Sequence, residues 1–148
     1  MARRLTFPCE RRASPLFGSV SRPVVLVALW SQKIQGWVRV VALVDTGADY
    51  TLLPHHYARH LGIRLDRDAQ VFDTMGVGGR ARVYVVRHWP MQLGHWRREI
   101  PLGFVTRDDL PPLFGRHACL ETFKLTLDRH RTTFTNRERD LFLVALGP

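Results

Sequence analysis

Apolar residues gather along this chain in short runs, either continuous or alternating with polar residues, which is the pattern of β-strands. The runs 24–30 and 36–44 are rich in Val and Leu and are separated by a polar break at 31–33. This arrangement predicts a hairpin of two long strands. Further strands are predicted over 50–54, 70–75, 80–86, 91–94, 97–105, 113–116, 124–128 and 131–135.

Two segments can form short helices. The first runs from His55 to Leu61 and stops at Gly62, and the second runs from His117 to about Phe123. The first helix would place His56 and His60 on one face, which suggests a metal site. Zinc needs three or four converging ligands, and the sequence has neither a His-Glu-x-x-His motif nor a cysteine nearby. We therefore expect solvated histidines, with no metal and no other cofactor.

Chain length and composition predict one globular domain over residues 23–148. The preceding segment, 1–22, is rich in arginine and interrupted by prolines, and we expect a basic, flexible arm. Its first twelve residues lack the apolar core of a secretory signal. At the other end, residues 137–148 include six consecutive apolar residues, and we expect a terminal strand that forms part of a dimer interface.

The net charge of +9 arises from 22 Lys and Arg against 13 Asp and Glu. A basic β-domain that binds nucleic acid is one alternative. Arginines that alternate with apolar residues, as over 80–83, are also typical of solvated strand faces, so nucleic acid is not the expected partner. Cys9 and Cys119 suggest no disulfide framework. The longest apolar run, 24–30, is too short to cross a membrane, and a cytoplasmic location is expected.

Three motifs follow one another in the sequence. Asp45-Thr46-Gly47 comes directly after the second long strand, a glycine-rich hairpin tip lies at 76–79, and Leu113-Phe114-Gly115-Arg116 follows later. On its own, the Asp-Thr-Gly triplet is equally typical of an ordinary turn. Together and in this order, the motifs resemble those of the retroviral-type aspartic proteases, the retropepsins, over about residues 23–134.

The resemblance implies an all-β, single-domain closed barrel of the acid-protease type with one or two short helices. It also implies a symmetric homodimer, because an aspartic protease needs two carboxylates and this chain has one Asp-Thr-Gly. Asp45 of each subunit would be catalytic. Support of the active-site loop is implied for Thr46, Gly47, Ala48, Asp49 and Arg116, with Asp49 held by Arg116. Flap and substrate contacts are implied for Gly76, Val77, Gly78, Gly79 and Tyr50.

The expected activity is hydrolysis of extended peptides by an endopeptidase. The chain departs from the family pattern at His117, where retropepsins usually have Asn or Asp. The main alternative is a module on the same fold that binds a peptide or protein without cleaving it, because folds outlive activities.

Overall fold

The computed structural model describes residues 3–76 and 79–136. Predictions that fall on Val77, Gly78 and the terminal segment 137–148 lie outside these residues. The strands are β1 (Arg4–Pro8), β2 (Glu10–Ser14), β3 (Gly18–Arg22), β4 (Val24–Ser31), β5 (Gly36–Val44), β6 (Thr51–Pro54), β7 (Gln70–Gly76), β8 (Gly79–Leu93), β9 (Trp96–Val105), β10 (Leu113–Phe114), β11 (Phe123–Leu127) and β12 (Arg131–Asn136). The helices are α1 (His56–Leu61), α2 (Leu65–Asp68) and the 3-10 turn η1 (Leu120–Thr122).

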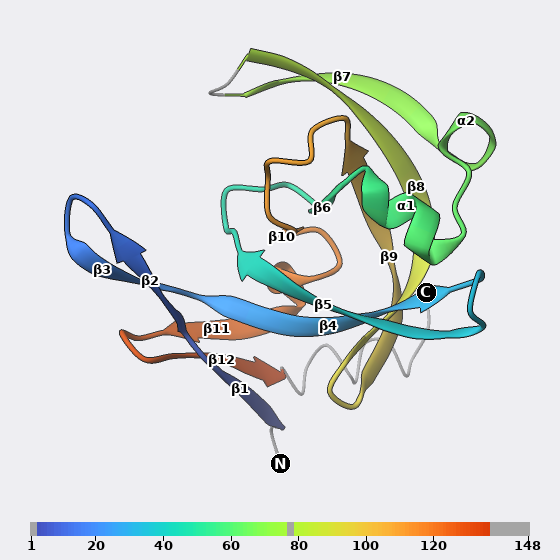
Figure 1. Ribbon diagram of the computed structural model, residues 1–148. Coiled ribbons are helices and arrows are strands. Elements are labelled where there is room, and N and C mark those ends of the chain that lie inside the picture. Colours follow the sequence, from blue (N-terminus) through green and yellow to red (C-terminus); the bar gives the residue numbers. More distant parts are fainter. Residues whose placement is uncertain (1–2, 77–78, 137–148) are drawn as a thin grey trace.

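A seven-stranded sheet in the order β4-β5-β10-β6-β9-β8-β7 forms the body of the molecule. An additional pairing between β4 and β8, through Ala28 with Gln92 and Leu29 with Met91, closes the sheet on itself (Figure 1). The fold is therefore an all-β barrel with short helices, as the family resemblance implies.

The core lies inside this barrel because alternate residues of each strand point inward. Burial in β4 follows this period, with Val25, Val27 and Leu29 fully or almost fully buried. Phe104 of β9 and Phe114 of β10 are also fully buried and belong to the same core cluster. The apolar pattern that predicts strands thus also identifies the core face.

The N-terminal segment differs from its prediction. Residues 4–8 do not form a flexible arm: they form β1, which pairs antiparallel with β12 in the three-stranded sheet β1-β12-β11. Leu5 and Phe7 alternate with polar residues and pack on the core, and the Phe7 ring lies 5.8 Å from that of Phe134. The arginines and prolines around this short alternation obscured it. The structured part of the chain therefore begins well before residue 23.

Two other predictions need correction. Residues 117–119 are a turn and not a helix, and only the 3-10 turn η1 follows, because Ala118 adopts a left-handed φ of 58° that interrupts a helix. The predicted strands 80–86 and 91–94 are parts of one strand, β8, which ends at Leu93 and is irregular between Val86 and Trp89. The predicted closing hairpin is confirmed as β11 and β12.

Candidate active site

The Asp45 loop leaves the barrel at the end of β5. The short strand β10 lies between β5, to which it is parallel, and β6, to which it is antiparallel. The backbone N–H of Asp45 donates to the carbonyl of Phe114 at 3.0 Å. Two strands that are far apart in the sequence thus fix the point where the loop begins.

The Asp45 carboxylate is oriented by its own loop. The backbone N–H of Gly47 donates to Asp45 Oδ1 at 2.9 Å, and the N–H of Ala48 donates to the Asp45 carbonyl at 3.2 Å. A Cβ at position 47 would lie 3.3 Å from the same carboxylate oxygen, so glycine leaves room for this contact. Asp45 is half-buried, whereas Thr46 and Gly47 are exposed. The loop therefore presents an oriented, partly exposed carboxylate.

Gly115, which directly follows β10, packs against the backbone of the next segment of the site. A Cβ at this position would overlap the carbonyl group of Tyr50 and lie 2.9 Å from its Cα. The N–H of Gly115 donates to Thr51 Oγ1 at 3.2 Å, and the hydroxyl of Thr51 in turn lies 3.5 Å from Cys119 Sγ. Sequence reasoning missed Thr51, although its place beside the Asp-Thr-Gly run was visible.

Asp49 and Arg116 are brought together as the resemblance implies. Arg116 Nη2 donates to Asp49 Oδ1 at 2.9 Å, with 54% and 79% of the two side chains exposed. Two backbone hydrogen bonds join the same segments, from Arg116 N–H to the Ala48 carbonyl at 2.9 Å and from His117 N–H to the Asp49 carbonyl at 2.7 Å. An exposed ion pair contributes at most about 1 kcal/mol, so the backbone bonds hold the loops together at least as strongly.

Tyr50, which follows the Asp45 loop in the chain, lines a groove of about 550 Å³. Burial raises the pKa of its hydroxyl above the usual value of 10, and the negative charge of Asp49 raises it further. Tyr50 therefore stays a neutral hydrogen-bonding group over the whole physiological range. The groove is also lined by Phe72, Asp73, Thr74, Val85, Arg87, His88, Glu99, Pro101, His117 and Ala118.

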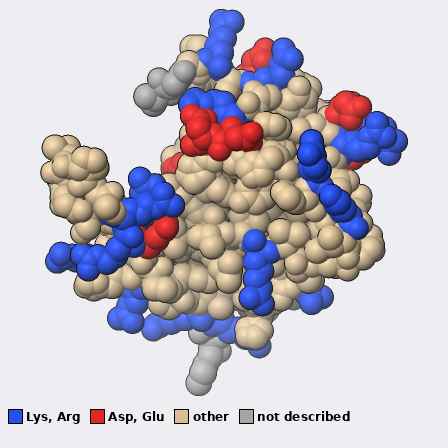
Figure 2. Space-filling view, in the orientation of Figure 1, with Lys and Arg blue, Asp and Glu red and all other residues tan. Residues whose placement is uncertain are grey.

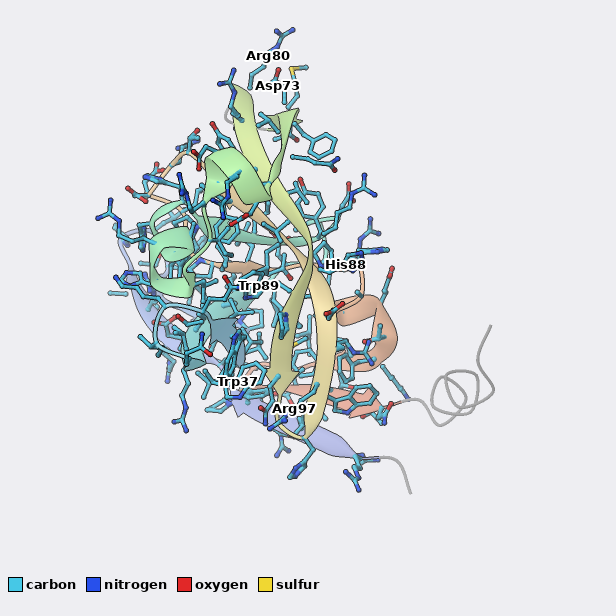
Figure 3. The ribbon with its side chains drawn as sticks, turned by 90° about the vertical axis from the view of Figure 1, so that its right-hand side faces the viewer. Trp37, Asp73, Arg80, His88, Trp89 and Arg97 are labelled. Carbon is cyan, nitrogen blue, oxygen red and sulfur yellow. The ribbon has the colours of Figure 1, made fainter. Side chains whose placement is uncertain are left out.

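The groove contains residues that the sequence did not assign to the site. Strand β7 supplies Phe72 and Asp73, and the turn after Gly115 supplies His117. Figure 3 shows Asp73 and Arg80 near the end of the β7–β8 hairpin, and His88 on the same face of the molecule. Only the tertiary structure brings β7 over the turn at residues 117–118, so no local pattern could have found this lining.

The β7–β8 hairpin is the predicted flap. It is antiparallel as far as the pair Gly76 and Gly79, and Gly79 has a φ of +102° that favours glycine. Val77 and Gly78, predicted as its tip, lie outside the described residues. Met75 is 77% exposed and Phe72 is 47% exposed, so the described part of the hairpin presents apolar surface to solvent.

The histidines of the first helical segment contact an acid. His55 Nδ1 and His56 Nδ1 lie 3.2 and 2.8 Å from Asp108 Oδ1, and the hydrogen bond with His56 is the largest cause that lowers the pKa of Asp108. The rings of His56 and His60 lie 6.1 Å apart. Within residues 3–76 and 79–136, no three His, Cys, Asp or Glu residues are placed to hold a metal ion. The same residues include no helix that is long and apolar enough to span a membrane.

Comparison with known proteins agrees with this geometry. Residues 31–118 match the family described as "gag-polyprotein putative aspartyl protease". The crystal structure of a retropepsin-like aspartic protease from Rickettsia conorii superimposes with a TM-score of 0.63 at 18% identity, covering 88% of this chain and 97% of that one. No curated protein matches the sequence.

The closed all-β barrel and the Asp45 loop thus define a protein of the retropepsin-like class. The chain belongs to the gag-polyprotein aspartyl protease family, whose match includes Asp45, the described flap strands and Arg116. The predicted fold and family are therefore confirmed.

Proposed function

We propose that this protein is an aspartic endopeptidase that is active as a symmetric homodimer. The observation that carries the proposal is the Asp45 carboxylate, which is oriented by the Gly47 N–H on a loop where Thr46, Gly47 and Asp49 are exposed. Family membership supports aspartyl protease chemistry in general. The sharing of one active site by two subunits is the more specific part of the proposal.

In this mechanism, two Asp45 carboxyl groups share one water molecule. The ionised carboxylate takes a proton from the water while the water oxygen attacks the scissile carbonyl carbon. The protonated carboxyl of the other subunit donates its proton to the carbonyl oxygen. The resulting tetrahedral diol collapses when the carboxyl that took up the water's proton passes it to the amide nitrogen and the other carboxylate takes back a proton from one diol hydroxyl. The C–N bond then breaks, the C=O re-forms and the amine leaves. One carboxyl must be protonated and the other ionised, so the rate should fall on both sides of an acidic optimum.

A second subunit is required because one chain supplies one such carboxylate. Two-fold symmetry brings identical residues together on the axis, so the axis would pass between the two Asp45 side chains. Thr46 is exposed beside Asp45 and would lie against the partner there.

The substrate would be a peptide in extended form beneath the β7–β8 hairpin. An extended peptide can add to strand edges through backbone hydrogen bonds, and side-chain pockets then select its sequence. The groove beside Tyr50, with its apolar wall from Phe72, Val85 and Pro101, is a suitable pocket on one side of the cleft.

The Asp45→Asn variant tests the chemistry. The amide can still accept the Gly47 hydrogen bond but cannot take up the water's proton, so we expect the cleavage rate to fall by at least about 100-fold with the fold intact. Cleavage of a peptide library should be followed by mass spectrometry, with the thermal midpoint measured in parallel. Asp66→Asn, an exposed change on α2, is the matched control and should cleave normally.

Retained cleavage in the Asp45→Asn variant would contradict the mechanism. Binding of extended peptides by the wild-type protein without cleavage at any pH would instead assign it as a binding module on the same fold.

A further inference from the structure

The β2–β3 hairpin is a separate arm on the barrel. Its two strands pair only with each other among the described residues, over Glu10–Ser14 and Gly18–Arg22. Its tip carries Leu16 and Phe17, which are 80% and 72% exposed. A two-stranded ribbon is marginally stable in water, and exposed apolar side chains at its tip add a further cost. Such an arm is stabilised when another surface covers it.

The root of the arm is fixed beside the active-site loop. The N–H of Val44, the residue before Asp45, donates to the carbonyl of Pro23 at 2.9 Å, and the N–H of Cys9 donates to the carbonyl of His130 at 2.8 Å. The first bond joins one end of the ribbon to the barrel at β5, and the second joins the other end to the turn between β11 and β12. The arm therefore starts from a defined position next to Asp45.

Strand register sets the direction of the arm. Strand β4 runs antiparallel to β5, with Val24 opposite Leu43, so residues before Val24 lie beyond the end of β5 from which the Asp45 loop departs. Figure 1 shows β3 leading into β4 with the ribbon projecting away from the barrel on that side. Five strand residues, 18–22, span about 16 Å at 3.3 Å per residue.

The length of the arm indicates which surface covers its tip. In the proposed function, the partner's Asp45 carboxylate lies within about 3 Å of its mate, so the partner subunit begins directly beyond the Asp45 loop. An arm that extends about 16 Å past this point on the same side must lie alongside the partner. The space-filling view shows Lys and Arg near the root of the arm and an uncharged tip (Figure 2).

We propose that the β2–β3 hairpin is a dimerisation arm that packs its Leu16–Phe17 tip on a second copy of this chain. Two-fold symmetry then gives two such contacts per dimer, one from each subunit. An aromatic tip that is buried in the complex is a typical anchor of protein interfaces. The inference rests on the proposed homodimer, and it assigns part of the interface to a segment outside the family match at 31–118.

Substitution of the tip tests the arm. Phe17→Asp places a charge where the partner would cover it, so we expect the concentration of half-dimerisation to rise at least tenfold, with an unchanged thermal midpoint of the monomer. Ile34→Asp is the matched control, because Ile34 is 61% exposed on the turn at the opposite end of β4. Sedimentation equilibrium of both variants and the wild type gives the comparison. Equal dimerisation of the Phe17→Asp variant and the wild type would overturn the proposal.

Photo-crosslinking provides a readout that does not depend on destabilising the protein. With p-benzoylphenylalanine at position 17, we expect illumination to give a covalent species of twice the chain mass, and the same probe at position 34 should give none. No crosslink at 17, equal crosslinking from both positions, or crosslinks only to other proteins would overturn the arm. Dimers that crosslink at 17 but never cleave peptide would support the arm and contradict the proposed function. Peptide cleavage without a crosslink at 17 would support the proposed function and contradict the arm.

Discussion

At the scale of single residues, two glycines shape the site in different ways. Gly47 leaves its N–H free to reach Asp45 Oδ1 at 2.9 Å and so orients the carboxylate. Gly115 is buried and lies against the backbone of Tyr50, where any side chain would collide with a rigid carbonyl group. Both roles depend on the absence of a Cβ, and neither depends on unusual backbone angles.

Gly115→Ala should therefore destabilise the protein. Overpacking of this kind costs about 1–3 kcal/mol, and we expect the upper end because the neighbouring atoms are backbone. Chemical denaturation gives the free energy of unfolding. Gly36→Ala is the control, since the nearest atom to an added Cβ is Ile34 Cδ1 at 3.8 Å. A Gly115→Ala variant as stable as the control would show that the Tyr50 segment moves freely.

The burial of Cys119 predicts how its thiol reacts. It is fully buried, and burial raises the pKa of its thiol to about 11, so almost no thiolate forms at pH 8. Cys9 is half-buried at the root of the β2–β3 arm. Iodoacetamide should modify Cys9 in the folded protein and reach Cys119 only after unfolding, as peptide mapping by mass spectrometry would show. Equal labelling of both would contradict the packing around Thr51.

At the scale of elements, the β11–β12 hairpin shows how one side chain closes a turn. Asp128 Oδ1 accepts hydrogen bonds from the N–H groups of His130 at 2.7 Å and Arg131 at 2.8 Å. These backbone bonds are the largest causes that lower the pKa of Asp128. The same hairpin pairs with β1 through β12, so its turn supports the whole three-stranded sheet.

The contribution of Asp128 to stability should depend on pH. A lowered pKa in the folded state means that the contribution is fully present above the ordinary carboxyl pKa, near 4, and is lost as pH falls through the lowered folded value. Asp128→Ala should therefore reduce the thermal midpoint at pH 7, and the difference from wild type should shrink below about pH 4. Asp66→Ala, on exposed α2, is the control and should show a much smaller effect at both pH values. A difference that is constant with pH would contradict the charged hydrogen bonds.

At the scale of the whole molecule, the proposed active site exists only in the dimer. A dissociated subunit holds one Asp45 and cannot form the pair, so the cleavage rate per chain should fall as the protein is diluted below the dissociation constant of the dimer. Parallel measurements of rate and sedimentation over a dilution series give the two curves. A rate per chain that stays constant while the protein becomes monomeric would contradict a shared site.

Net charge gives a further expectation for the dimer. Each chain carries +9, so two copies repel one another over distances that salt screens. Dimerisation should therefore strengthen when ionic strength rises from about 0.01 to 0.15 M. Weaker dimerisation in salt would show that ion pairs across the interface outweigh this repulsion.

The sequence by itself determined the features that depend on neighbouring residues. The apolar runs gave the strands of the barrel, and the Asp45-Thr46-Gly47 turn after an apolar strand identified the carboxylate. The order of the three motifs identified the family. The strand and turn signals are local because strand period and turn chemistry are set by residues a few positions apart.

Only the tertiary structure decided which distant segments meet. Asp49 and Arg116 are 67 residues apart, and the contact between Thr6 and Thr133 joins residues 127 positions apart. The prediction of a flexible N-terminal arm failed for this reason: β1 is too short to bury its apolar residues alone and becomes a strand only because β12 is there to pair with it. Strand pairing is stabilised by the partner's backbone and side chains, which no local pattern contains.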